Sequence, residues 1–108
     1  MQPDELYRRL VQRGTDWAEA EHAASLMEGN LKSVKATIAL KYKAEGCSVA
    51  ESDLKAEADP EYIEFRSVAI DARRDAHKAR VIYKAAEDYI NIWRTIEASE
   101  RAATRVAT

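Results

Sequence analysis

Residues 60–108 read PEYIEFRSVAIDARRDAHKARVIYKAAEDYINIWRTIEASERAATRVAT, and this stretch decides the fold. After Pro60 it contains neither glycine nor proline, the residues that most often end a helix. Asp59 is a suitable N-cap, and proline is favoured at the first helical position. The stretch therefore predicts one helix over residues 60–104, roughly 68 Å long at about 1.5 Å per residue.

Apolar residues in this helix recur at spacings of three and four, the pattern of a helix packed along another helix. They are Tyr62, Phe65, Ala69, Ala72, Ala76, Ala79, Tyr83, Ala86, Ile90 and Trp93. A second row of this kind lies earlier in the chain and comprises Trp17, Ala20, Ala24, Met27, Leu31, Val34 and Ile38. The connection over residues 46–59 is too short for a parallel return. We therefore expect an antiparallel pair in which Trp17 lies level with Asp88 and Tyr89, and Leu6 and Leu10 lie near Trp93 and Ile96.

The other helix boundaries are predicted from the few remaining proline, glycine and capping residues. Pro3 opens a short helix over residues 3–13, which Gly14 closes, and a second helix spans residues 16–45 up to Gly46. Ser48 and Glu51 form a capping box that starts a short helix over residues 49–56. The predicted fold is all-α. It is a single domain over residues 1–108, a long antiparallel, coiled-coil-like two-helix hairpin with a short N-terminal helix and a short helix at the connection.

Composition excludes several classes of protein. The 108 residues are 46% hydrophobic and 33% charged, with only 3 Gly and 2 Pro, which disfavours a β-sandwich or barrel with many turns. No run of about 18 apolar residues is present, so we expect no membrane span. The first residues carry no apolar core of a signal peptide, and the single cysteine excludes an internal disulfide. These features predict a cytoplasmic location.

Residues 81–96 carry more apolar side chains than one helix stripe can hold. Because a two-helix hairpin buries one face per helix, the surplus predicts self-association. The alternative is that the N-terminal helix folds over the surplus. The expected oligomerisation residues are Trp17, Ile82, Tyr89, Ile90, Ile92, Trp93 and Ile96.

Charge is strongly segregated although the net charge is only −2. Residues 45–64 hold seven acids and one base, whereas residues 65–84 hold six bases and two acids. Arginines recur at one heptad position, broken only by Glu87, and such a row can follow a phosphate backbone. The candidate DNA-binding residues are Lys32, Lys35, Lys41, Lys43, Arg66, Arg73, His77, Arg80, Lys84 and Arg94. The alternative is that these bases pair with neighbouring acids such as Asp71, Asp75 and Glu87.

Signals for catalysis are weak. Glu19 and His22 form half of a helical di-iron motif, but no second half exists because Arg74 stands three residues before His77. Cys47 has no histidine near it in the predicted hairpin, and the three glycines are too widely spaced for a phosphate-binding loop. We therefore expect no enzyme activity, no metal site and no cofactor.

The segments 78–84 and 89–96 resemble small helical phage proteins, and the overall plan is similar to the UvsY-like recombination mediators. The matching stretches are the lysine-rich residues 32–43, the acidic residues 51–64 and the long helix over residues 69–98. The resemblance implies a ring-forming accessory protein of the cytoplasm, that of the host cell if a phage encodes it. Such a protein binds single-stranded DNA and helps to load a recombinase over single-strand-binding protein. It further implies that Lys32, Lys35, Lys41 and Lys43 contact DNA and that Ile90, Trp93 and Ile96 hold the assembly.

A second hypothesis comes from the acidic segment. A small acidic inhibitor or scaffold would dock residues 51–64 on a basic protein partner. An inhibitor of a host nucleic-acid-guided defence would fit this description.

Overall fold

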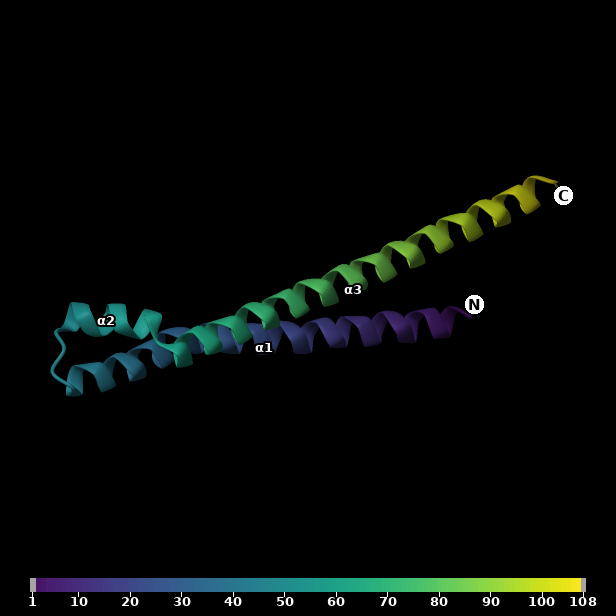
Figure 1. The fold of residues 1–108 in the computed structure, drawn as a ribbon. Helices are drawn as coiled ribbons and strands as arrows, with labels where there is room; N and C mark the ends of the chain where they lie inside the picture. The colour runs from purple at the N-terminus through teal and green to yellow at the C-terminus, as the bar shows by residue number, and fades with distance from the viewer. Residues whose placement is uncertain (1, 108) are drawn as a thin grey trace.

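The computed structural model describes residues 2–107 and consists of three helices over that range. Helix α1 spans Pro3–Ala44, α2 spans Val49–Ala58 and α3 spans Pro60–Ala107. Helices α1 and α3 run antiparallel, with α2 folded back at the connection (Figure 1). The molecule measures 88 × 19 × 16 Å. The predicted all-α hairpin with a short connecting helix is therefore confirmed.

The predicted break between residues 13 and 16 is wrong, because α1 runs through it without interruption. Gly14 lies against α3, where a Cβ atom would be only 3.3 Å from Cε2 of Tyr83. The Thr15 hydroxyl donates to the carbonyl of Val11 at 2.9 Å, as it does inside a helix. Gly14 thus provides room for an aromatic ring and does not end the helix, so there is no separate N-terminal helix.

The other boundary signals are confirmed. Gly46 has a φ of 98°, the left-handed conformation that glycine adopts after a helix end. The Ser48 hydroxyl accepts a hydrogen bond from the backbone N–H of Glu51 at 3.2 Å and so caps α2. The Asp59 carboxylate accepts from the N–H of Glu61 at 2.9 Å and caps α3. Helices α2 and α3 continue slightly beyond their predicted ends, to Ala58 and Ala107.

Both predicted apolar rows face each other in a seam between α1 and α3. Their buried members are Ala24, Ile38, Ala69, Ala76 and Ile90. The remaining members are half-buried, and they are Trp17, Ala20, Met27, Leu31, Val34, Tyr62, Phe65, Ala72, Ala79, Tyr83, Ala86 and Trp93. The core is therefore a single thin layer in which small residues occupy the most buried places.

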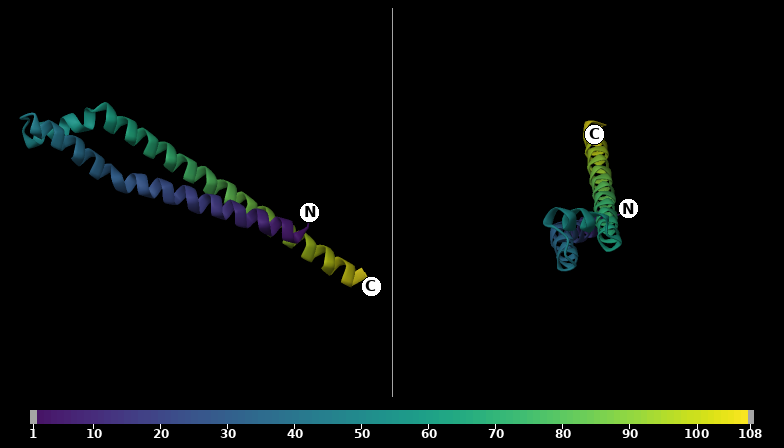
Figure 2. Two further views of the ribbon diagram at one scale, coloured as in Figure 1. Left: turned by 90° about the horizontal axis from the view of Figure 1, so that it is seen from below. Right: turned by 60° about the vertical axis from the view of Figure 1, so that its left-hand side comes forward.

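The register of the two helices differs from the prediction. Trp17 packs on Tyr83, with ring centroids 5.4 Å apart, and does not lie level with Tyr89. Helix α2 packs back along α1 and buries Ala56, so α3 begins some way back from the tip of α1. The C-terminal end of α3 consequently projects beyond the start of α1, as the views in Figures 1 and 2 agree. Leu6 and Leu10 do lie beside Trp93 as expected, whereas Ile96 is exposed.

Replacing Gly14 and Gly29 separately by alanine tests the role of Gly14. Alanine favours a helix over glycine by about 1 kcal/mol. A Cβ at Gly29 would meet no atom within 4 Å, so Gly29→Ala should raise the free energy of unfolding by about 0.5–1 kcal/mol. Gly14→Ala should gain less or lose stability, because the Tyr83 ring must move. Urea denaturation followed by circular dichroism measures both, and equal gains would contradict a packing role for Gly14.

Candidate functional site

Two rows of α3 side chains flank the seam on opposite sides. The first row follows directly after seam residues such as Ala72 and Ala79, and we call it the basic flank. It comprises Arg66, Arg73, Arg80, Glu87, Arg94 and Arg101. The second row includes positions directly before seam residues such as Tyr83 and Ile90, and we call it the apolar flank. It comprises Ile82, Ala85, Tyr89, Ile92, Ile96, Ser99, Ala103 and Val106. Positions just after and just before a seam residue lie on opposite sides of a helix stripe.

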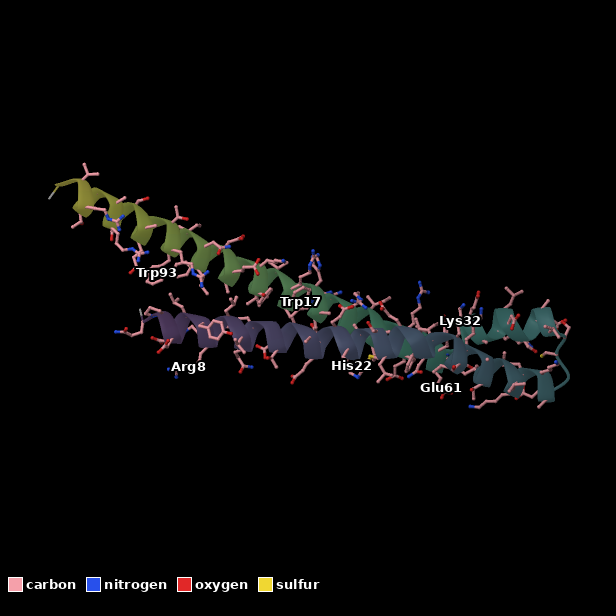
Figure 3. The ribbon with its side chains drawn as sticks, turned by 180° about the vertical axis from the view of Figure 1, so that it is seen from behind. Arg8, Trp17, His22, Lys32, Glu61 and Trp93 are labelled. Carbon is pink, nitrogen blue, oxygen red and sulfur yellow. The ribbon has the colours of Figure 1, made fainter. Side chains whose placement is uncertain are left out.

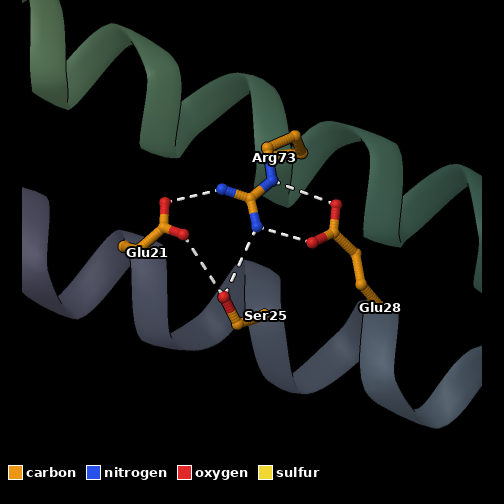
Figure 4. A network of polar contacts seen from close by, with 4 residues as sticks. All are labelled: Glu21, Ser25, Glu28 and Arg73. Carbon is orange, nitrogen blue, oxygen red and sulfur yellow. Dashed lines mark hydrogen bonds and ion pairs between the residues drawn. The ribbon is translucent and has the colours of Figure 1, made fainter.

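Arg73, on the basic flank, crosses the seam and binds two glutamates of α1 (Figure 4). Its Nε and Nη2 donate to the Glu28 carboxylate at 3.0 and 2.5 Å. Its Nη1 donates to Glu21 at 2.6 Å, and Nη2 also reaches the Ser25 hydroxyl at 3.4 Å. Ser25 in turn donates to Glu21 at 3.3 Å. We call this arrangement the Arg73 clamp, since one guanidinium holds two successive turns of α1.

The clamp changes the ionisation of its members. The hydrogen bonds that Arg73 donates to Glu28 and to Glu21 raise the pKa of Arg73 above its ordinary value. The hydrogen bond from Arg73 lowers the pKa of Glu28 below its ordinary value of 4.5. Bidentate guanidinium–carboxylate pairs are directional as well as charged, so the clamp favours one register of α3 on α1. Arg73 is thereby engaged within the hairpin.

Three other candidate DNA-binding residues also have acidic neighbours. Lys35 donates to Glu57 of α2 at 2.6 Å, and this hydrogen bond raises the pKa of Lys35 and lowers that of Glu57. Lys41 lies 3.4 Å from Glu61 of α3. Lys84 lies 3.8 Å from Glu87 on its own helix. Lysines of α1 therefore hold part of the acidic segment against the hairpin.

A further contact fixes the start of α3 to the end of α1. The Tyr42 hydroxyl donates to the Asp59 carboxylate at 2.5 Å. This hydrogen bond raises the pKa of Tyr42, and together with the N–H of Glu61 it lowers the pKa of Asp59. Asp59 is thus both the cap of α3 and its attachment to α1.

The remaining candidate DNA-binding residues are exposed and form no ion pair within residues 2–107. They are Lys32, Lys43, Arg66, His77, Arg80 and Arg94. Arg94 lines a small surface hollow with Tyr7, whose side chain is 63% exposed, and with Trp93. The basic flank therefore presents cations at both ends and a paired arginine in the middle.

The candidate oligomerisation residues divide into two groups. Trp17, Ile90 and Trp93 lie within the seam, and Figure 3 shows Trp93 near the start of α1. The other four are exposed. The exposed fraction is 48% for Ile82, 56% for Tyr89, 59% for Ile92 and 53% for Ile96. The sequence interpretation missed the continuation of this row to Ala103 and Val106. The spacing of three and four could have revealed it, but small residues weaken the signal.

The residues considered for metal binding or catalysis remain apart. His22 lies at the edge of an open hollow beside Gly14 and Trp17. Lys55 donates to the sulfur of Cys47 at 3.2 Å. Within residues 2–107, no three histidine, cysteine or acidic side chains are grouped so that they could hold a metal ion.

Comparisons with known proteins identify no relative of this chain. No protein-family model, no curated protein and no solved structure matches the chain. None of the helices, over the part of the chain that the structure describes, has an apolar stretch suited to crossing a membrane. The features of the molecule that bear on its function are therefore the basic flank and the apolar flank.

Replacing Arg73 by glutamine should make the hairpin less stable at neutral pH and less sensitive to acid. The pKa of Glu28 is lowered in the folded state, so its contribution is present above its ordinary value of 4.5 and is lost as the pH falls through the lowered value. Thermal unfolding at neutral and acidic pH measures this.

A neighbouring arginine supplies the control. Arg74 is exposed and lies 3.7 Å from Asp71 on its own helix. Arg74→Gln should leave both the unfolding temperature and its acid dependence close to those of the unmodified protein. If the two variants behave alike, the clamp has no role in holding α3 on α1.

Proposed function

We propose that this protein is a non-enzymatic accessory protein that forms a homo-oligomer and binds single-stranded DNA, as a recombination mediator does when it assists recombinase loading. One observation carries the proposal. Helix α3 carries two largely exposed surfaces on opposite sides of the seam, an apolar one and a cationic one in which, among the described arginines, only Arg73 is bound within the hairpin. Assembly through the apolar flank therefore leaves the basic flank open to a ligand. The protein would act in the cytoplasm, where its DNA, recombinase and single-strand-binding partners are found.

The chemistry of the basic flank fits a single strand better than a duplex. Guanidinium groups such as those of Arg66, Arg80 and Arg94 bind phosphate oxygens with several donors each. Exposed Tyr7 lies beside Arg94 and offers an aromatic face on which an unpaired base can stack. Stacking needs a base whose face is free, which a duplex does not provide.

Charge reversal on the basic flank tests this function. A double variant, Arg80→Glu with Arg94→Glu, should weaken binding of a fluorescent single-stranded oligonucleotide at least about tenfold, because each reversal replaces attraction to a phosphate with repulsion. The dependence of log affinity on log salt should become shallower by about 0.7 for each phosphate that the variant no longer neutralises. Fluorescence anisotropy at several salt concentrations measures both quantities.

The double variant Arg74→Glu with Lys78→Glu is the matched control, because it makes the same charge change on the same helix away from the basic flank. It should bind like the unmodified protein. Equal weakening in both variants, or no binding by the unmodified protein at low salt, would overturn the DNA-binding proposal.

The hairpin tip favours a second candidate, a small acidic inhibitor or scaffold that binds a basic protein. Leu54 and Val49 are 69% and 61% exposed there. They lie beside Glu51 and Asp53, which form no ion pair within the described residues. Exposed apolar side chains beside acids suit a basic protein surface. In this case DNA binding would be absent, and charge reversal at Glu51 and Asp53 would abolish capture of the partner.

A further inference from the structure

The C-terminal end of α3 is a helix without a neighbour. Every side chain over residues 94–106 is exposed, and the seam with α1 ends at Trp93. We call residues 95–107 the arm. Most helical stability in proteins comes from tertiary packing of an apolar face. Contact with another element would therefore stabilise the arm.

The sequence of the arm shows on which side that contact lies. Beyond Trp93, the positions that continue the seam spacing are Glu97 and Glu100, so the seam becomes acidic where α1 begins. The apolar flank instead continues through Ile96, Ala103 and Val106, the last being 88% exposed. The arm thus keeps its apolar row on the flank that α1 does not cover.

We propose that two copies of this chain pair antiparallel through their apolar flanks, so that each arm lies along the hairpin of the other copy. The inference rests on the assembly part of the proposed function and adds the surface and the direction of pairing. Centred between Ile92 and Ile96, the pairing sets each residue of the row opposite one from the second copy. The opposed residues are Ile82 with Val106, Ala85 with Ala103, Tyr89 with Ser99 and Ile92 with Ile96.

Side-chain size favours the antiparallel direction. It sets the large Tyr89 opposite the small Ser99 and places isoleucines at the centre, as close packing requires. A parallel pair would instead set each residue against its own copy, so that Tyr89 meets Tyr89. It would also leave each arm in contact only with the other arm, whereas the antiparallel pair packs each arm against a complete hairpin.

Charge favours the same direction. In the antiparallel pair, Glu97 and Glu100 of one copy reach the level of Arg9 and Arg13 on α1 of the other. Arg13 is exposed and has no ion-pair partner within residues 2–107, and Arg9 has only an exposed contact with Glu5. Acids that end the seam of one hairpin thus meet bases at the start of the other.

Cross-linking through introduced cysteines tests the direction. In a Cys47→Ser background, Ala85→Cys and Ala103→Cys chains are prepared separately and mixed, with no DNA present. The antiparallel pair puts these two positions opposite each other, whereas like positions lie about 27 Å apart at about 1.5 Å per residue. A short thiol-to-thiol cross-linker should therefore join the mixture into dimers at least about tenfold more efficiently than either chain alone, on the basis of this separation.

Each other outcome overturns the inference. Efficient cross-linking of either chain with itself would show parallel pairing. A monomeric mass of the unmodified protein in sedimentation, with no cross-linking above collision level, would show that the flanks do not pair. Since no DNA is present, the result is independent of DNA binding and separates failure of this inference from failure of the DNA-binding proposal.

Discussion

A pair of helices can bury only one face of each, and this constraint governs the whole molecule. The seam between α1 and α3 is one layer thick, and its most buried members include Ala24, Ala69 and Ala76. Small residues bring two helices close together but bury little apolar surface per turn. Ile82, Tyr89 and Ile92 have no place in such a layer and remain at the surface. The exposed flank is therefore a direct result of the two-helix architecture.

Polar contacts, together with the packing of Trp17 on Tyr83, determine how the two helices align along the seam. A row of alanines would accept several registers with similar burial, whereas the Arg73 clamp accepts few because its donors must reach Glu21 and Glu28 together. The bond from Tyr42 to Asp59 sets the starting point of α3. The offset that results leaves the arm beyond the start of α1. The same contacts that stabilise the hairpin thus create the surface through which we propose it pairs.

The fold was largely predictable because its signals are local. The caps at Ser48 and Asp59 and the spacing of the seam residues are each set by a few neighbouring residues. The helix end predicted at Gly14 was wrong because the sequence does not distinguish a glycine that ends a helix from one that makes room for an aromatic ring. Only the position of Tyr83 on another helix distinguishes them.

The candidate site was less predictable because it depends on the register. A shift of α3 by a few ångströms along the helix axis would change which acid Arg73 contacts. The register of α3 in turn depends on how far α2 folds back along α1. The heptad row of arginines could be recognised in the sequence, but its division into paired and open members needs coordinates. The apolar flank was visible up to Ile96, where large residues give way to alanine and serine.

Amide hydrogen exchange over the arm, measured at a series of protein concentrations, tests the central claim most directly. If a second copy holds the arm, exchange at residues 95–106 should be fast in dilute solution and should slow as the concentration rises, while the seam around Ala76 stays protected throughout. Exchange in the arm that stays fast at every concentration would contradict the account, because nothing would then cover the apolar flank.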